Sequence, residues 1–193
     1  MSQQINTNVL GTFNISRAAI PYLRTAAAVQ GQPAALVTFG SLASWWSAAS
    51  LTHYCATKWA VSGMTEGLYE ELKPFGIDVC VIEPGYTRTE FLDKGGARRI
   101  MSEKQLALYD GTPAHDMDAM LDDAHGKQQG DVTKCATVIL DVFTRAGVAE
   151  GKEIPMRLPL GSDTVSVIRK KCEDTLKFLE EWGPISSSIG HDE

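Results

Sequence analysis

Two short apolar runs, residues 34–39 and 77–82, constrain the fold of this 193-residue chain more than any other feature. Both consist almost entirely of apolar side chains and are flanked by glycine or proline, a pattern typical of strands buried on both faces of a parallel sheet. Between them, residues 53–73 place small and apolar side chains at helical spacing and stop at Pro74. Strand, helix and strand in this order predict a right-handed parallel crossover, and therefore an α/β fold with a parallel sheet and flanking helices.

The rest of the chain is expected to form one domain over residues 1–185. Apolar periodicity predicts further helices and a third strand, at residues 3–28, 132–146 and 164–182 for the helices and 156–160 for the strand. Residues 88–131 are polar, glycine-containing and weakly periodic, with short helical stretches expected at 102–109 and 117–124, and they predict a mobile substrate lid. Residues 186–193 are serine-rich and end acidic, so they are expected to be a disordered tail.

Charge and hydropathy exclude several classes of partner. The formal net charge is -6 and no long basic run is present, which argues against nucleic-acid binding. No stretch approaches the roughly 20 apolar residues of a membrane span, and the N-terminus lacks the layout of a signal peptide. The four cysteines are scattered without a paired spacing, which suits a reducing compartment. These features predict a cytoplasmic protein with a small-molecule partner.

Two other groups of side chains have competing interpretations. Trp45 and Trp46 precede the central helix, where core packing and a lip that contacts substrate are both open. Histidines and aspartates crowd one later segment but lack any known metal-ligand spacing, so a solvated acidic helix is expected and no metal is assigned: His115, Asp116, Asp118, Asp122 and His125.

The pair Tyr54 and Lys58 is the strongest chemical signal. Residues four apart on a helix stand on one face, a turn from each other. A phenol has an unperturbed pKa of about 10, and a neighbouring ammonium favours the phenolate, so this spacing can bring a tyrosine toward proton transfer near neutral pH. The spacing alone is common by chance, and its context decides.

The context is a set of polar residues at strand ends. Ser41 closes the first strand, and Pro84-Gly85 follows the second, with Thr87 and Thr89 just beyond. Ligands of open α/β sheets bind at the carboxyl ends of parallel strands, so these residues are expected to converge with Tyr54 on one crevice.

The chain here resembles the short-chain dehydrogenase/reductase family, through a set of motifs that together are specific: Asn8-x-x-Gly11, Gly40-Ser41, Tyr54-x-x-x-Lys58 and Pro84-Gly85-x-x-x-Thr89. The resemblance implies an NAD- or NADP-dependent oxidoreductase with a Rossmann-like sheet that interconverts a carbonyl and an alcohol. The residue that selects between the two dinucleotides is not recognisable. Family members commonly associate through the helices that here carry Asn8 and Tyr54, so a homo-oligomer is also implied.

The resemblance also implies roles for the matching residues. Tyr54 would be the general acid/base, and Ser41 would hydrogen-bond the reacting oxygen. Lys58 would lower the pKa of Tyr54 and hold the nicotinamide ribose, while Asn8 would hold a water of a proton relay. The nicotinamide end of the cofactor would be bound by the segment after the second strand, together with the catalytic pair: Tyr54, Lys58, Pro84, Gly85, Thr87 and Thr89.

A glycine-rich GxxxGxG turn after a strand, which binds the pyrophosphate in this family, does not occur in the sequence. We therefore expect the chain to correspond to the C-terminal catalytic portion of the family domain, without the glycine-rich half, and to be inactive on its own. The alternative is a non-catalytic remnant or interaction subunit. A sugar-nucleotide epimerase or dehydratase shares the Tyr-Lys pair, but the short spacing from Ser41 to Tyr54 and the absence of a substrate domain count against it.

Overall fold

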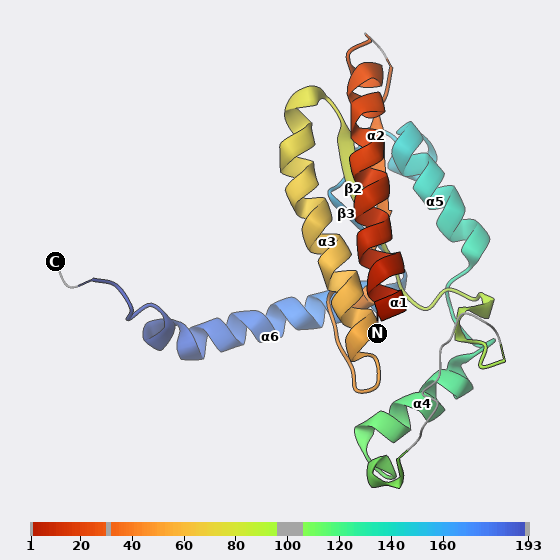
Figure 1. The fold of residues 1–193 in the computed structure, drawn as a ribbon, viewed down its shortest axis with the longest axis vertical. Helices are drawn as coiled ribbons and strands as arrows, with labels where there is room; N and C mark the ends of the chain where they lie inside the picture. Colours follow the sequence, from red (N-terminus) through yellow and green to blue (C-terminus); the bar gives the residue numbers. More distant parts are fainter. Residues whose placement is uncertain (1, 30–31, 96–105, 192–193) are drawn as a thin grey trace.

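The centre of the fold is a sheet of three parallel strands in the order β1-β2-β3. The computed structural model describes residues 2–29, 32–95 and 106–191 (Figure 1). The strands are β1 (Ala35–Phe39), β2 (Asp78–Pro84) and β3 (Arg157–Leu160). Phe39 is paired with Ile82, and Ile82 with Leu158, so β2 lies between the other two. The predicted α/β fold with a partial parallel sheet and flanking helices is confirmed.

Two long helices cover one face of the sheet. The first begins as α1 (Ser2–Gln4), continues as a π-helical segment (Ile5–Gly11) and ends as α2 (Thr12–Ala27), and beside it runs α3 (Thr52–Leu72). The chain leaves α3 through a left-handed turn at Gly76, whose φ of 70° suits a residue without a Cβ. An apolar cluster joins these helices to the sheet: Ile20, Leu23, Leu36, Leu72, Ile77 and Val79.

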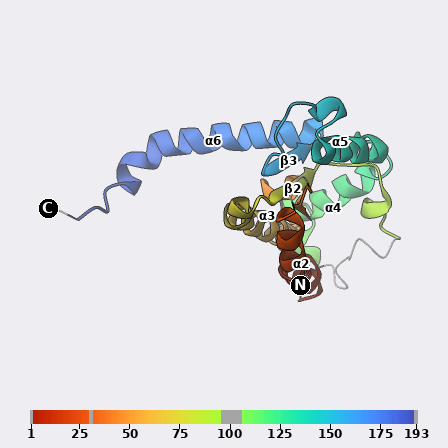
Figure 2. The same ribbon diagram turned by 90° about the horizontal axis from the view of Figure 1, so that it is seen from above.

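The other face is covered by α5 (Val132–Thr144), which Figure 2 shows on the opposite side of the sheet from α2 and α3. Asp131 begins this helix by accepting hydrogen bonds from the backbone N–H groups of Thr133 and Lys134. The cluster beneath it is formed by residues of β2, β3 and α5: Cys80, Ile82, Val142 and Leu160. It contains no residue of β1, so this layer is built over two strands of the three.

The structure corrects one expectation about β1. Residues 34–39 were expected to be buried on both faces, but Val37 and Phe39 are 37% and 54% exposed, whereas Leu36 and Thr38 are buried. The reason is that β1 is an edge strand of this sheet, and α5 packs over β2 and β3 instead. An almost wholly apolar sequence did not reveal this position.

The segment after β2 is tied together at its two ends. Thr87 and Gly130 form an isolated bridge, and the guanidinium of Arg88 donates to the backbone oxygen of Gln128 at 2.9 Å. Between them lie two short 3-10 turns (Glu90–Leu92 and Ala107–Tyr109) and α4 (Pro113–Ala124). Half of the helix expected at residues 102–109, namely 102–105, falls outside the described residues, and the described half contains the 3-10 turn Ala107–Tyr109. That this segment is a lid stays a prediction.

The last helix, α6 (Ser162–Ser186), is longer than the helix expected at residues 164–182. It begins against the sheet, where Thr164 is fully buried, and then runs away from the body of the molecule (Figures 1 and 2). No helix in the described part of the chain is long and apolar enough to cross a membrane.

Candidate active site

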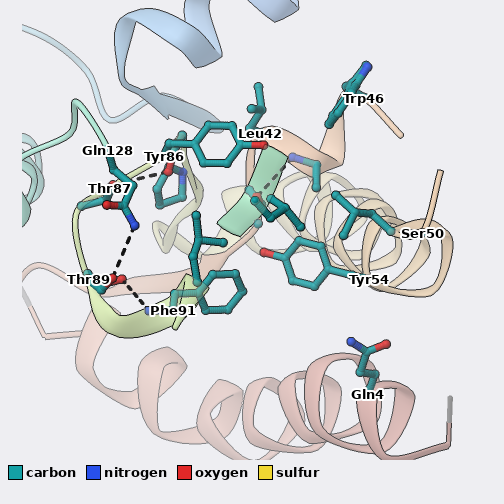
Figure 3. A pocket seen from close by; sticks show the side chains of 18 of the residues that line it. Gln4, Leu42, Trp46, Ser50, Tyr54, Tyr86, Thr87, Thr89, Phe91 and Gln128 are labelled. Carbon is teal, nitrogen blue, oxygen red and sulfur yellow. Dashed lines mark hydrogen bonds between the residues drawn. The ribbon is translucent and has the colours of Figure 1, made fainter. Parts of the chain in front are cut away.

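A pocket of about 710 Å³ lies at the carboxyl ends of β1 and β2. Its lining combines residues from the β1 end, from α3 and from the segment after β2, as Figure 3 shows in part: Ser41, Leu42, Tyr54, Pro84, Gly85, Tyr86, Thr87 and Thr89. The structure thus brings together six of the seven positions that sequence patterns placed in the crevice or at the nicotinamide end, with Lys58 outside the lining. Asn8 is likewise not among the described residues that line it.

Ser41 is held in a tight turn directly after β1. Its Oγ accepts a hydrogen bond from the backbone N–H of Ala43 at 3.1 Å, and its own N–H donates to Ser44 Oγ at 3.2 Å. Ser44 Oγ in turn donates to the backbone oxygen of Lys58 in α3 at 3.0 Å and accepts from Ser62 Oγ at 2.8 Å. Gly40 is required here, because a Cβ would lie 2.9 Å from the hydroxyls of Ser44 and Ser62. Serine hydroxyls therefore fix the β1 end to α3.

Tyr54 is half-buried in the pocket, with the ring of Phe91 at 5.9 Å between centroids. Burial raises the pKa of the Tyr54 phenol above its ordinary value, and a side-chain hydrogen bond with Ser41 opposes this shift. The phenol therefore stays protonated at neutral pH and can donate a proton to an oxygen beside Ser41. Ser41 lines the same pocket.

Lys58 lies differently from the expectation. Its Nζ is 5.8 Å from the centroid of the Tyr54 ring and donates a hydrogen bond to the backbone oxygen of Phe39 at 2.8 Å. Burial lowers the pKa of the Lys58 ammonium. In this arrangement the ammonium sits over the ring face, and the pKa of Tyr54 is raised, contrary to the lowering by Lys58 that we expected.

Asn8 stands in the π-helical segment before α2. Its Nδ2 donates to Thr57 Oγ1 at 3.0 Å, and Thr57 Oγ1 donates to the backbone oxygen of Tyr54 at 2.7 Å. A π-helical turn widens the helix locally and is often found at functional sites. Asn8 therefore reaches α3 between Tyr54 and Lys58, next to both.

The end of β2 is held by two carboxylates that sequence patterns did not identify. Glu83 is fully buried and accepts hydrogen bonds from Trp45 Nε1 at 2.7 Å, from Ser62 Oγ at 2.9 Å and from the Arg157 guanidinium at 2.9 Å. Arg157 also lies 4.4 Å from the centroid of the Trp45 ring and donates to Glu66. Trp45 is therefore a structural residue, whereas Trp46 lines the pocket. A lone glutamate inside an apolar run was the available signal for Glu83.

Asp163, in the first turn of α6, holds the backbone after Gly85. Its Oδ2 accepts from the N–H of Tyr86 at 2.7 Å, and its Oδ1 accepts from the N–H of Thr164 at 2.8 Å. A Cβ on Gly85 would lie 2.1 Å from this carboxylate, which explains why a glycine follows Pro84. The pocket wall that carries Tyr86 and Thr87 is thus positioned from the start of α6.

Gln128 has a buried side-chain oxygen in the pocket lining that lacks a hydrogen-bond donor within the described part of the chain, and this oxygen shows whether a nicotinamide fits the pocket. Its side chain is 4% exposed and lines the pocket, its Nε2 faces the backbone oxygen of Thr89 at 3.5 Å, and its Oε1 has no hydrogen-bond partner among the described residues (Figure 3). A buried acceptor without a donor is unfavourable. The carboxamide of a nicotinamide carries such a donor, so the polar groups beside Thr89 fit this end of the cofactor. No group of three or more possible metal ligands gathers anywhere in the described ranges.

Ser41, Tyr54 and the Pro84-Gly85 turn meet at the carboxyl edge of a parallel sheet, where ligands of open α/β folds bind. The family model for short chain dehydrogenases matches residues 1–99, just over half of the 193 residues. The chain belongs to this family, and its three parallel strands with flanking helices correspond to part of the family's Rossmann domain.

Known proteins resemble the chain over most of its length. The oxidoreductase BOA17 of Botryotinia fuckeliana is 30% identical over 183 residues, which are 95% of this chain and 61% of that protein. A short-chain dehydrogenase from Streptomyces avermitilis superposes with a TM-score of 0.75 at 27% identity, over 95% of this chain and 60% of the other. The chain thus spans about three fifths of the length of these relatives.

The cofactors of similar structures are nicotinamide dinucleotides. A family member from Burkholderia phymatum in complex with NAD has a TM-score of 0.67 at 21% identity, over 88% of this chain and 56% of the other. One from Burkholderia cenocepacia in complex with NADP has a TM-score of 0.53 at 19% identity, over 92% and 58%. At these identities the likeness shows the fold alone.

The comparisons also correct the placement of this chain within the family. From the absent glycine-rich turn we expected a C-terminal catalytic portion that lacks the N-terminal half. That prediction is wrong, because the family model matches from residue 1 to residue 99, its N-terminal Rossmann portion, and the structural matches align from near the start. The physical reason is that the family match depends on the residues that are present and on how they pack. The absence of one motif does not show to which part of the family domain those residues correspond.

Proposed function

We propose that this protein interconverts a carbonyl and an alcohol by hydride transfer with NAD or NADP, and that Tyr54 is the general acid/base. The observation that carries the proposal is that Ser41 and Tyr54 line one pocket together with the segment from Pro84 to Thr89. A neutral phenol and a hydroxyl that share one pocket can polarise and protonate the same substrate oxygen.

Each residue in or near the pocket has a separate proposed role, which follows from its position. Ser41, fixed by the Ser44 and Ala43 contacts, would hydrogen-bond the carbonyl oxygen. Tyr54 would donate its proton to that oxygen in reduction and accept it back in oxidation. Asn8 would hold a water between α3 and solvent, through which the proton is replaced.

The nicotinamide cofactor, when bound, supplies or accepts the hydride. We propose that Thr87, Thr89 and the backbone beside them hold its carboxamide, with Gln128 Oε1 as a further acceptor. Pro84 and Gly85 would line the site beside it, and Tyr54 and Lys58 would hold its ribose. For Lys58 to hold the ribose, its ammonium would exchange the bond to the backbone oxygen of Phe39.

The substrate is expected to be a small, partly apolar carbonyl or alcohol. The pocket has the volume of a site for a small organic ligand, and it is lined by apolar and aromatic side chains beside the polar pair: Leu42, Trp46, Phe91, Leu92 and Leu121. These side chains offer shape and apolar contact, so specificity would come from size more than from charge.

The direct test uses the native gene product and a panel of ketones and alcohols with both dinucleotides, followed by nicotinamide absorbance. Tyr54→Phe removes the transferable proton and should lower turnover by about 10² to 10⁴ while dinucleotide affinity changes little. Tyr69→Phe, a tyrosine of the same helix outside the pocket lining, is the matched control and should leave turnover unchanged. Normal turnover by Tyr54→Phe would exclude the proposed role.

The pH dependence sharpens the same test. Because the pKa of Tyr54 is raised, reduction should hold across neutral pH and fall only as the alkaline pKa is passed and the phenol ionises. Oxidation, which needs the phenolate, should rise toward alkaline pH. A turnover for reduction that rises with pH through this range would contradict Tyr54 as the proton donor.

The proposed reaction needs a bound dinucleotide, and because no glycine-rich turn in this sequence can receive a pyrophosphate at a helix N-terminus, we expect the affinity of this chain for NADH and NADPH to be weaker than micromolar. Calorimetric titration of this chain with NADH and NADPH measures that directly, and micromolar binding would refute the expectation. If the native gene product binds no dinucleotide and turns over no substrate, the proposed activity is wrong and a non-catalytic interaction subunit takes its place.

A further inference from the structure

Glu83 is a fully buried carboxylate to which the proposed reaction assigns no role. Its two oxygens accept hydrogen bonds from three separate parts of the chain. Oε2 accepts from the indole N–H of Trp45 at 2.7 Å, and Oε1 accepts from the Arg157 guanidinium and from Ser62 Oγ in α3, each at 2.9 Å. A buried charge is stable only where partners of this kind surround it, so the carboxylate holds these three groups in place.

Two of these hydrogen bonds lead to the turn that carries Ser41. Ser41 precedes a 3-10 turn whose last residue is Ser44, and Trp45 follows it. Trp45 is bound to Glu83 directly. Ser41 is bound through two hydroxyls: its N–H donates to Ser44 Oγ at 3.2 Å. Ser62 Oγ then donates to Ser44 Oγ at 2.8 Å and to Glu83 at 2.9 Å. One carboxylate therefore anchors both ends of the turn.

The hydroxyl of Ser44 has no spare capacity for another partner. A serine hydroxyl donates one hydrogen bond and accepts two. Ser44 Oγ donates to the backbone oxygen of Lys58, and it accepts from the N–H of Ser41 and from Ser62 Oγ. Ser44 and Ser62 are both buried, so water does not reach these hydroxyls. Loss of the Ser62 hydroxyl therefore lets Ser44 turn, and the acceptor of the Ser41 N–H moves with it.

The backbone position of Ser41 decides where its own hydroxyl points. Its Oγ accepts from the N–H of Ala43 at 3.1 Å, and the hydroxyl proton is then available for an oxygen in the pocket. A reacting group that is misplaced by about 1 Å can lose about 10² in rate. Whatever holds the N–H of Ser41 therefore also holds its contact with the reacting oxygen.

We propose that Ser62 and Glu83 are positioning residues, which act on the reaction through Ser41. The inference rests on the proposed function, because it needs Ser41 to contact the reacting oxygen. Neither Ser62 nor Glu83 is part of the pocket lining. Their role is to fix the hydroxyl of Ser44, which accepts from the N–H of Ser41.

The first experiment does not depend on turnover. Hydrogen exchange of the Ser41 N–H is measured by NMR in the native gene product, relative to the N–H of Val81, which donates to a backbone oxygen within the sheet. Ser62→Ala should speed the exchange of Ser41 relative to Val81 by about tenfold, the equivalent of one weakened hydrogen bond. An unchanged ratio would overturn the proposal.

Thr65 provides the matched control. It is a buried hydroxyl of the same helix, and its Oγ1 lies 2.7 Å from Thr38 Oγ1 in β1. Thr65→Val removes this hydroxyl with little change of shape, and it should leave the exchange ratio of Ser41 unchanged. Equal effects of Ser62→Ala and Thr65→Val would mean that any buried hydroxyl of α3 has this influence, and would overturn the proposal.

Glu83→Gln tests the charged end of the network. The variant keeps an oxygen that accepts a hydrogen bond but removes the charge, so Ser62 and Trp45 are held less strongly. The exchange of Ser41 relative to Val81 should again rise. An unchanged ratio would overturn the role proposed for Glu83.

The second experiment joins the network to the reaction. Ser62→Ala should lower kcat by about tenfold with little change in KM, because the substrate contacts remain and only the alignment of Ser41 is lost. In a Ser41→Ala background the same change should have no further effect, since Ser62 acts through Ser41. Thr65→Val should leave kcat unchanged in both backgrounds. A loss from Ser62→Ala that multiplies in full with the loss from Ser41→Ala would overturn the proposal.

The two experiments fail in different ways. Normal turnover by Tyr54→Phe, or no turnover by the unaltered protein, would overturn the proposed function and with it the role of Ser41 in the reaction. The exchange ratios decide in either case whether Ser62 and Glu83 position Ser41.

Discussion

Strands β1 and β2 are both almost wholly apolar in sequence and both end at the pocket, yet they differ in their position in the sheet and in their burial. β2 is central, and its residues from Val79 to Glu83 are buried, whereas β1 is an edge strand with one face exposed. The end of β1 is fixed by serine hydroxyls and by the half-buried Lys58 ammonium on the backbone oxygen of Phe39, and the end of β2 by the fully buried carboxylate of Glu83 and by Asp163. Hydrogen bonds that involve a charge are stronger than neutral ones, and a buried charge left alone is costly. The β2 wall of the pocket should therefore be the more rigid and the more easily broken by mutation.

The largest effect should come from removing the buried carboxylate at the β2 end. Glu83→Ala leaves the guanidinium of Arg157 and the indole N–H of Trp45 without their acceptor, and should lower the free energy of unfolding by about 3–5 kcal/mol. Glu66→Ala removes the other, half-exposed partner of Arg157 and should cost about 0–1 kcal/mol. Urea unfolding of both variants measures the difference, and equal costs would show that Glu83 does not hold this strand end.

A second effect at the β2 end concerns the approach of Asp163 to Gly85. Gly85→Ala forces the Asp163 carboxylate away from the N–H groups of Tyr86 and Thr164, and should cost about 1–3 kcal/mol. If the clash is the cause, the same change should cost clearly less in an Asp163→Ala background. A double-mutant cycle on unfolding free energies measures this coupling, and additive costs would place the strain elsewhere.

At the β1 end the corresponding effect should be smaller. Ser44→Ala removes a hydroxyl that joins the N–H of Ser41 to the backbone oxygen of Lys58, and should cost about 1–2 kcal/mol, because the groups left behind are neutral. Ser47→Ala, an exposed serine of the same loop, is the control and should stay within about 0.5 kcal/mol. A cost for Ser44→Ala that matches the cost of Glu83→Ala would remove the contrast between the two ends.

The sequence revealed the elements and the crevice because these depend on local patterns. Periodicity placed the strands and helices, and the spacing of Ser41, Tyr54 and Pro84 placed one edge of the sheet. It did not reveal Glu83 and Asp163 as supports, since their partners Arg157 and Tyr86 lie 74 and 77 residues away in the chain. Nor did it reveal that β1 is an edge, because apolar content alone does not tell which neighbours a strand has. The pKa of Tyr54 followed burial, which the helix spacing with Lys58 does not encode.

The smallest effect tests the edge position of β1 itself. Val37 is 37% and Val79 1% exposed, and a threonine has nearly the shape of a valine but adds a hydroxyl. In residues 1–193, Val37→Thr should change the unfolding free energy by no more than about 0.5 kcal/mol, because water solvates the new hydroxyl at an exposed site. Val79→Thr, the matched change in the central strand, should cost about 1–3 kcal/mol, because its hydroxyl is buried among Leu36, Leu72 and Ile77. The two variants are compared by urea unfolding under one set of conditions. Equal costs would mean that the outer face of β1 is covered in solution, so that the two strands are buried alike and their different ends alone distinguish them.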